Sequence, residues 1–183
     1  MIELEPCLSG LRYLFAKEVR ALNPSAGSNP AGSALKLFMT MKGKITLKAM
    51  CIFQKDGQIL VSKGFDKVKN ETFYRFLGEH INFFESGEKG IRREIQEELK
   101  SDIKNLKFID IVENLFIYQG EKYHEIDFIY SGDLVKKELY NQTSIHIIKE
   151  THEFDAEWFP IKDIFTNKIP LYPKFNYKEL FKP

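Results

Sequence analysis

The 183-residue sequence has only two cysteines, no long apolar run and almost no net charge. Cys7 and Cys51 lie far apart and match no metal-binding or redox spacing, which argues against a disulfide framework and fits a reducing cytoplasm. No run of about 18 apolar residues is present, so no membrane-spanning helix is expected. The N-terminus lacks a basic stretch followed by an apolar one, which argues against secretion. The net charge of +1 provides no overall basic field of the kind that stable nucleic-acid binding uses.

The chain does have enough apolar surface for one sizeable core, since 43% of its residues are hydrophobic and 16 of them are Phe. Its beginning differs from the rest: residues 23–33 are rich in Asn, Pro, Ser, Gly and Ala and have no periodic apolar face. We therefore predict a leader at residues 1–40, flexible or non-native, and one domain at residues 41–183. In the non-native case translation starts upstream of the true start, which is Met39 or Met41. The leader is expected to be dispensable.

The apolar pattern after residue 44 predicts strands, one prominent helix, further strands and short terminal helices. The dipeptide Asp56-Gly57 between two β-prone runs is a strong hairpin signal. Predicted strands lie at residues 45–53, 58–62, 71–77, 108–118, 123–130 and 157–159, and predicted helices at 88–99, 161–165 and 177–181. This order indicates a mixed α/β or α+β fold.

The predicted helix at residues 88–99 carries an acidic stripe. At 100° per residue, Ile91, Ile95 and Leu99 form an apolar stripe. Glu94, Glu97 and Glu98 form a second stripe beside it, and their repulsion costs about 0.2–0.5 kcal/mol per neighbouring pair. A hard divalent cation would remove that cost, because carboxylate oxygens are its preferred ligands. The alternative is a solvated acidic face paired with local Lys and Arg side chains.

The sequence around this helix resembles the Nudix box. Glu85 stands at the required distance before Arg93-Glu94-Ile95-Gln96-Glu97-Glu98, so the charged core of the box is in register. Two box glycines are replaced, by Glu79 and by Lys100. The first replacement matters if that turn needs a positive φ, and the second weakens the usual helix C-cap. The resemblance implies an α/β/α sandwich with a mixed central sheet, and it extends over residues 44–165.

The resemblance also implies roles for individual residues. The catalytic set would be Glu94, Glu98, Arg93 and Glu85. Mg²⁺ or Mn²⁺ would be held by Glu94, Glu97 and Glu98 with the carbonyl of Gly78. Arg93 would orient the site by pairing with a box carboxylate such as Glu85. The general base varies across the family, and the candidates are Glu94 within the box and Glu125, Glu150 and Glu153 outside it.

Residues near the box are candidates for substrate binding. Arg75 could meet a phosphate or form a surface ion pair, and His80 lies in the loop of the box. Tyr74 could stack on a base, as could Phe73, Tyr118 and Trp158, although core packing is the commoner role of each.

Taken with the resemblance, the sequence predicts a cytoplasmic metal-dependent hydrolase. It would cleave a diphosphate linkage in a nucleoside diphosphate derivative, which could be a nucleotide, a nucleotide sugar or an oxidised nucleotide. The alternative is a catalytically weak or inactive Nudix-fold module that binds nucleotides. The expected partner is a small nucleotide-like molecule, without stable nucleic-acid binding or membrane association, and a homodimer stays open.

Overall fold

The structure is a computed structural model that describes residues 43–149, 153–166 and 170–181. The predicted leader at residues 1–40 lies outside the described residues, as does the candidate base Glu150. In the part of the chain that the structure describes, no helix has the length and apolar character needed to cross a membrane.

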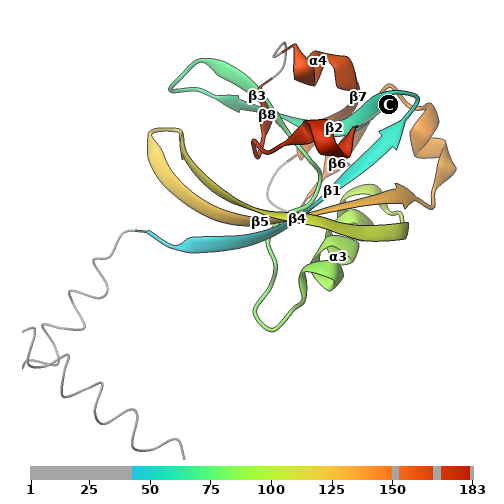
Figure 1. The fold of residues 1–183 in the computed structure, drawn as a ribbon, viewed down its shortest axis with the longest axis horizontal. Helices are drawn as coiled ribbons and strands as arrows, with labels where there is room; N and C mark the ends of the chain where they lie inside the picture. The colour runs from blue at the N-terminus through green and yellow to red at the C-terminus, as the bar shows by residue number, and fades with distance from the viewer. Residues whose placement is uncertain (1–42, 150–152, 167–169, 182–183) are drawn as a thin grey trace, which may run out of the picture. The chain divides into compact units, whose positions relative to one another are not determined.

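Eight strands, three α-helices and one 3₁₀ helix follow one another along the described chain (Figure 1). In order they are β1 (Ile45–Lys55), β2 (Gln58–Asp66), β3 (Glu71–Arg75), α3 (Gly87–Leu99), β4 (Ile103–Tyr118), β5 (Glu121–Leu134), η1 (Lys137–Asn141), β6 (Ser144–Ile148), β7 (Glu153–Pro160), α4 (Ile161–Phe165), β8 (Leu171–Tyr172) and α5 (Tyr177–Leu180). All the predicted strands and helices after residue 44 are present, with shifted ends.

The largest errors of the sequence prediction concern β4 and the elements after β5. β4 begins at Ile103, five residues before the predicted start at Phe108. Its pairing with β5 shifts register between Lys104 and Lys107 and again between Phe108 and Asp110. Such bulges interrupt the strict alternation that identifies a strand in a sequence. The elements β6, β8 and η1 were not predicted, because each has five residues or fewer and is too short to show a clear periodicity of apolar residues.

The strands form one mixed sheet in the order β4-β5-β1-β2-β3-β8, and β7 joins β2 to β6. β1 runs parallel to β5 over Ile45–Phe53. It pairs with β2 only at the hairpin, where Gln54 and Lys55 face Ile59 and Gln58. The two halves of the sheet therefore separate away from the hairpin (Figure 1), and the β4–β5 and β2–β3 hairpins lie on opposite sides of the space between them.

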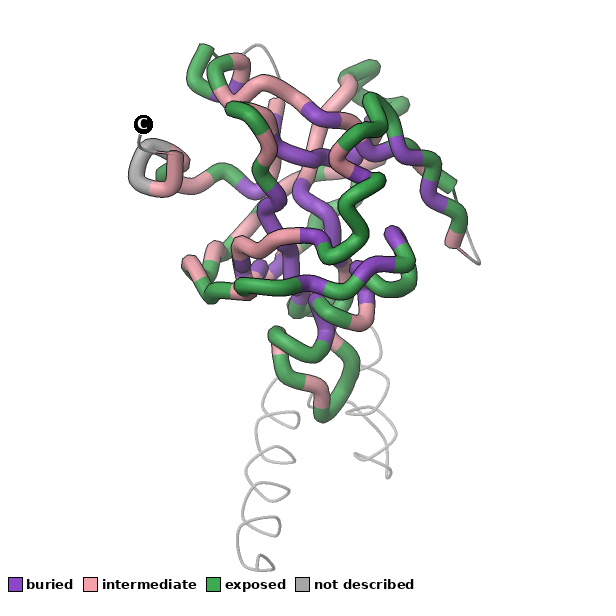
Figure 2. Tube along the Cα trace, turned by 90° about the vertical axis from the view of Figure 1, so that its right-hand side faces the viewer, coloured by how far each residue is buried: buried purple, intermediate pink, exposed green. Residues whose placement is uncertain are grey.

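β1 contributes to two hydrophobic cores because its side chains alternate between its faces. Ala49, Cys51 and Phe53 belong to the core that includes Ile91 and Ile95 of α3. Met50 and Ile52 belong to the other core, which includes Ile164 of α4 and packs against Tyr177 and Leu180 of α5. Figure 2 shows the buried stretches gathered in the interior of the domain. Helices thus cover both faces of the sheet, which confirms the predicted α/β/α arrangement with a mixed central sheet.

Helix α3 has well-defined ends. Ser86 is its N-cap, and the Ser86 hydroxyl accepts a hydrogen bond from the Lys89 N–H at 3.3 Å. Lys100 ends the helix in the left-handed conformation, with φ 53°, and its N–H donates to the carbonyl of Gln96. The position therefore keeps the backbone conformation that a C-capping glycine would adopt, although a side chain makes this conformation less favourable. The replacement of the second box glycine leaves the cap intact.

Candidate active site

The segment that enters helix α3 runs beside β1 and is held to it by backbone hydrogen bonds. The Cys51 N–H donates to the Leu77 carbonyl at 2.9 Å and the Ala49 N–H to the Glu79 carbonyl at 3.0 Å. Gly78, between them, has φ 119°, and a Cβ there would stand 2.1 Å from the Ala49 carbonyl oxygen. Only glycine fits this position. Glu79 is not among the described residues with positive φ, so the replacement of the first box glycine costs no backbone strain.

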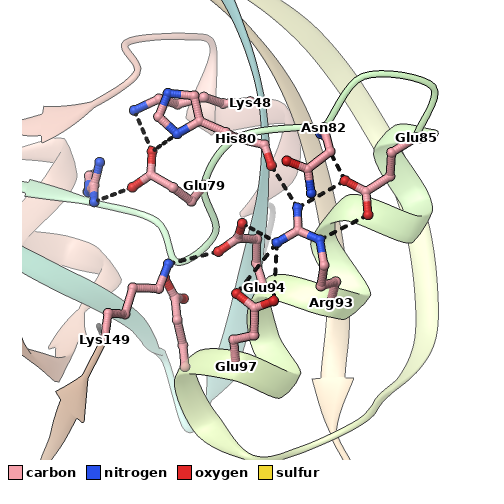
Figure 3. A network of polar contacts seen from close by, with 11 residues as sticks. Lys48, Glu79, His80, Asn82, Glu85, Arg93, Glu94, Glu97 and Lys149 are labelled. Atoms are coloured by element: carbon pink, nitrogen blue, oxygen red, sulfur yellow. Dashed lines mark hydrogen bonds and ion pairs between the residues drawn. The ribbon is translucent and has the colours of Figure 1, made fainter. Parts of the chain in front are cut away.

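Arg93 connects four groups at the start of α3 (Figure 3). Its Nε donates to Glu85 Oε1 at 3.0 Å and its Nη2 donates to Glu85 Oε2 at 2.9 Å. Its Nη1 donates to Glu94 Oε1 at 2.6 Å and lies 3.4 Å from Glu97 Oε1. Nη2 also donates to the His80 carbonyl at 2.9 Å. The predicted pairing of Arg93 with Glu85 is therefore present, and these hydrogen bonds lower the pKa of Glu85 to about 2.

Glu94 and Glu98 lie on the buried face of α3, one helical turn apart, and share a lysine. The ammonium of Lys149 lies 2.8 Å from Glu94 Oε2 and 2.9 Å from Glu98 Oε1. The second oxygen of Glu98, Oε2, is buried and has no hydrogen-bond partner. Burial raises the pKa of Glu98, and Lys149 opposes this rise. We refer to these groups as the helix cluster; its members are Glu85, Arg93, Glu94, Glu97, Glu98 and Lys149.

A second set of charges lies on the neighbouring strands. Lys48 of β1 places its ammonium 2.9 Å from Glu79 Oε1 and 2.9 Å from Glu125 Oε1. Arg75 Nη2 donates to Glu79 Oε2 at 3.0 Å, and His80 Nδ1 lies 3.0 Å from Glu79 Oε1. Burial opposes ionisation of Glu79, but Arg75 and Lys48 outweigh it and lower the pKa of Glu79 to about 2. Glu79, which replaces the first box glycine, thus forms ion pairs with both Lys48 and Arg75.

Asp127 completes this second set. It is fully buried on β5, and its backbone is in register with that of Lys48 on β1. Burial raises the pKa of Asp127 to about 7, with a further contribution from Glu125, while Lys48 opposes the rise. A substantial share of the Asp127 side chains is therefore protonated at neutral pH. We refer to this set as the strand cluster; its members are Lys48, Arg75, Glu79, Glu125 and Asp127.

A cleft of about 400 Å³ opens between the β4–β5 and β2–β3 hairpins. Its walls include the aromatic side chains of Phe73, Phe116, Tyr118, Tyr123 and Tyr172. Lys48, Arg75 and Glu125 line it as well, so the cleft borders the strand cluster. The cleft therefore joins an aromatic wall to the strand cluster, and Arg75 links that cluster electrostatically to Glu98 of the helix cluster.

A model of the NUDIX domain family matches residues 46–179 of this sequence. The chain belongs to the Nudix family. A search of curated proteins found no match. A search of solved structures found matches, three of which are the following.

A MutT Nudix hydrolase from Burkholderia pseudomallei is 16% identical, with a TM-score of 0.46 over 75% of this chain and 95% of its own. A Nudix hydrolase from Nitrosomonas europaea is 18% identical, with a TM-score of 0.49 over 68% of this chain and 78% of its own. An ADP compounds hydrolase is 14% identical, with a TM-score of 0.48 over 68% of this chain and 64% of its own. The family match confirms the prediction of a Nudix-type pyrophosphohydrolase.

The structure brings most of the predicted Nudix site residues together, but not all of them. Arg75 lines the cleft, whereas Tyr74 does not. The Tyr74 ring packs on Phe159, with ring centroids 4.6 Å apart. Neighbouring residues of a strand point to opposite faces, so Phe73 is the one that lines the cleft. The structure thus places Tyr74, a predicted substrate-binding residue, outside the cleft. Trp158 is a core residue, and its Nε1 donates to the Leu139 carbonyl at 3.2 Å.

The candidate general bases outside the box differ in their surroundings. Glu125 is buried and paired with Lys48. The Glu153 side chain is 72% exposed and lies 3.7 Å from His146, outside the lining of the cleft. Its exposure and its place outside the cleft make Glu153 a poor candidate.

Sequence reasoning missed Lys48, Asp127 and Lys149. The first two did carry a signal, because each is a charged residue directly flanked by apolar ones within a β-prone run, as in Leu47-Lys48-Ala49 and Ile126-Asp127-Phe128. A charge in such a position is rarely buried without a partner. Lys149 carried no such signal. It follows β6, which was itself not predicted, and it is 55 residues from Glu94.

Proposed function

We propose that this Nudix protein hydrolyses a diphosphate linkage in a nucleoside diphosphate derivative, with Mg²⁺ or Mn²⁺ bound by Glu94, Glu97 and Glu98. One observation carries the proposal. Glu94 and Glu98 are buried one turn apart and direct an oxygen each at a single positive charge, 2.8 Å and 2.9 Å away.

The donor set suits a hard divalent ion. It consists of carboxylate oxygens, which Mg²⁺ and Mn²⁺ prefer. Glu98 Oε2 is buried without a hydrogen-bond partner, a costly state that an ion would relieve. Among the described residues, no group of three or more Asp, Glu, His or Cys side chains is already arranged to bind a metal ion. In this structure Arg93 and Lys149 occupy oxygens of Glu94 and Glu98. When bound, the ion would neutralise diphosphate oxygens and lower the pKa of an attacking water.

The chain's own residues would position the reaction. Arg93 holds Glu85 and Glu94 in fixed orientations through three hydrogen bonds to their carboxylate oxygens, and it donates another to the His80 carbonyl. Arg75, which lies between Glu79 and the cleft, could donate to a phosphate oxygen once the substrate is bound. His80 is held near the same place by Glu79. Glu94 is the base candidate within the box, and Glu125 is the candidate outside it that borders the cleft.

The cleft suits a nucleoside. Phe73 and Tyr118 meet edge to face with ring centroids 5.7 Å apart, and Phe116 stacks on Tyr123 at 5.2 Å. An aromatic wall accepts the π-face of any base. With the base against this wall, the phosphates would extend toward Arg75 and α3. The wall does not identify the base, so nucleotides, nucleotide sugars and oxidised nucleotides are all within this class.

A binding module without turnover is the second candidate. The cationic groups of Arg93 and Lys149 favour it, because they already compensate part of the acidic charge. The retained carboxylates Glu94, Glu97 and Glu98 favour the enzyme, since nucleotide binding alone has no need of them. The division into a leader at 1–40 and an enzyme domain at 41–183, the cytoplasmic location, the lack of nucleic-acid and membrane partners and the homodimer all stay predictions of the sequence.

A turnover screen tests the proposal. The full chain is incubated with nucleoside triphosphates, nucleotide sugars, dinucleoside polyphosphates and oxidised nucleotides, first with Mg²⁺ and then with Mn²⁺. We expect phosphate-ester products from at least one class, loss of activity in EDTA and recovery when the ion returns. Glu88→Gln is the matched control for box variants, because Glu88 is exposed and pairs with Arg92 outside the cluster. Nucleotide binding without turnover under either ion would establish the binding module instead.

A further inference from the structure

Lys149 has an unusual position for a lysine. Its ammonium points at the carboxylate of Glu94 (Figure 3). The Lys149 side chain is 14% exposed, and the two carboxylates that it reaches, those of Glu94 and Glu98, are 5% and 1% exposed. A buried carboxylate needs a cationic partner, a metal or a proton. Lys149 is the ion-pair partner of Glu98, and it shares Glu94 with Arg93. Its ammonium therefore lies at the point where the oxygens of the two helical glutamates converge.

The geometry also distinguishes Lys149 from Arg93. Arg93 binds Glu94 through Oε1, whereas Lys149 binds it through Oε2. Arg93 is additionally fixed by both oxygens of Glu85 and by the His80 carbonyl. For Lys149, the hydrogen bonds and ion pairs observed in the described structure all go to Glu94 and Glu98. Arg93 therefore has anchoring contacts besides Glu94 and Glu98, whereas the observed contacts of Lys149 are to these two glutamates.

We propose that Lys149 is an internal cation that holds the Glu94–Glu98 pair in the metal-free enzyme and competes with the metal ion for it. This inference rests on the proposed function, because it takes Glu94 and Glu98 as metal ligands. A divalent ion on these oxygens stands beside the ammonium, and like charges at that separation repel. Lys149 therefore withdraws from the oxygens when the ion binds. It stabilises the empty site and weakens the affinity for the metal.

Isothermal titration of the full chain with Mn²⁺ tests this. Lys149→Met keeps an unbranched apolar stem and removes the charge. We expect the Kd for Mn²⁺ to fall at least tenfold relative to the wild type. We also expect the metal-free variant to melt at a lower temperature, and Mn²⁺ to raise its midpoint by more than it raises that of the wild type. Lys149→Gln should give the same two shifts and serves if the first variant does not fold.

Lys122→Met is the matched control, since it makes the same change of net charge at the exposed start of β5. Its Kd should equal that of the wild type. An unchanged or weaker affinity in both Lys149 variants would overturn the inference. Mn²⁺ titration of Glu98→Gln, made both in the wild type and in Lys149→Met, distinguishes a wrong competition hypothesis from a wrong assignment of the metal ligands. If Glu98→Gln weakens Mn²⁺ binding but the Lys149 variants do not tighten it, the competition alone is wrong. If Glu98→Gln has no effect in either background, the metal assignment fails too.

Discussion

The helix cluster and the strand cluster are built from the same chemistry and reach different charge states. In each, a lysine ammonium lies 2.8–2.9 Å from two glutamates, and an arginine holds one of these glutamates at 2.6–3.0 Å. The helix cluster has four carboxylates and two cationic side chains, so two negative charges remain. The strand cluster has three carboxylates and two cationic side chains, so one remains.

The two clusters differ in how their excess negative charge can be neutralised. In the strand cluster, one negative charge is in excess, and Asp127, whose pKa is raised to about 7, can remove it by keeping a proton. In the helix cluster, the pKa of Glu85 is lowered to about 2, and Glu97 is 52% exposed. An excess of two negative charges on hard oxygens matches one divalent ion. Burial raises the pKa of Glu98 in the helix cluster as well, although Lys149 opposes the rise. The comparison therefore assigns a proton to Asp127 in the strand cluster, and it supports the proposal that a metal ion would complete the helix cluster.

The strongest way to break this comparison is to remove one charge from the helix cluster. Glu98→Gln should reduce turnover by about two orders of magnitude or more, because loss of about 2.7 kcal/mol of transition-state stabilisation is a hundredfold. The melting temperature should change little, since Gln keeps the polar shape, Lys149 keeps its ion pair with Glu94, and the cluster loses one of its excess negative charges. Steady-state kinetics and thermal unfolding measure the two effects, with Glu88→Gln as control. Turnover equal to that of the wild type would refute the catalytic role of the cluster.

Asp127→Asn tests the proton in the strand cluster. The folded protein binds this proton more tightly than the unfolded chain, whose Asp has a pKa near 3.8. The stability of the wild type should therefore fall as the pH rises from about 4 to about 8, whereas the variant has no such proton to lose. The free energy of unfolding of the variant relative to the wild type should rise across this range, by on the order of 4 kcal/mol, since each unit of pKa difference is worth about 1.4 kcal/mol.

Urea unfolding at several pH values measures this difference. Asp110→Asn is the control, since Asp110 is exposed on β4, and its difference from the wild type should not vary over the same range. A constant difference for Asp127→Asn would mean that Asp127 is ionised in the folded protein at neutral pH.

Arg75→Lys examines whether the two clusters act on one substrate. Arg75 is bound to Glu79 and interacts electrostatically with Glu98. Lysine keeps the charge but loses the planar fork that matches phosphate oxygens. We expect KM to rise about tenfold, equivalent to about 1.4 kcal/mol of binding, with kcat changed less than KM. Arg92→Lys, on the outer side of α3, should leave both constants unchanged. A selective loss of kcat would assign Arg75 to the chemical step instead.

The smallest expected effect comes from an uncharged substitution in the aromatic wall of the cleft. Phe73→Leu removes the aromatic ring from the cleft and keeps apolar volume. KM should rise about threefold, because stacking on an aromatic side chain is worth about 1–3 kcal/mol per base and leucine retains part of the contact. The effect should not depend on salt or pH, in contrast to the charged variants. Phe83→Leu, at a fully exposed ring, is the matched control and should be silent.

The sequence by itself determined the helix cluster almost completely. Glu85, Arg93, Glu94, Glu97 and Glu98 lie within 14 residues. Helical periodicity places the last four on neighbouring turns of α3 without reference to the rest of the chain, whereas Glu85 precedes the helix and was identified by its spacing in the Nudix box. The Asp56-Gly57 hairpin and the capped helix α3 were predictable for the same reason, since local backbone preferences decide them.

Only the tertiary structure decided the strand cluster and the place of Lys149. Lys48, Glu79 and Glu125 come from three segments that meet because β1 pairs with β5 on one side and with the segment entering α3 on the other. The choice of Phe73 over Tyr74 for the cleft depended on which face of β3 turns inward. Burial set the protonation of Asp127, and burial is a property of the whole packed domain. These contacts join residues tens of positions apart, and no local pattern in the chain encodes their distance.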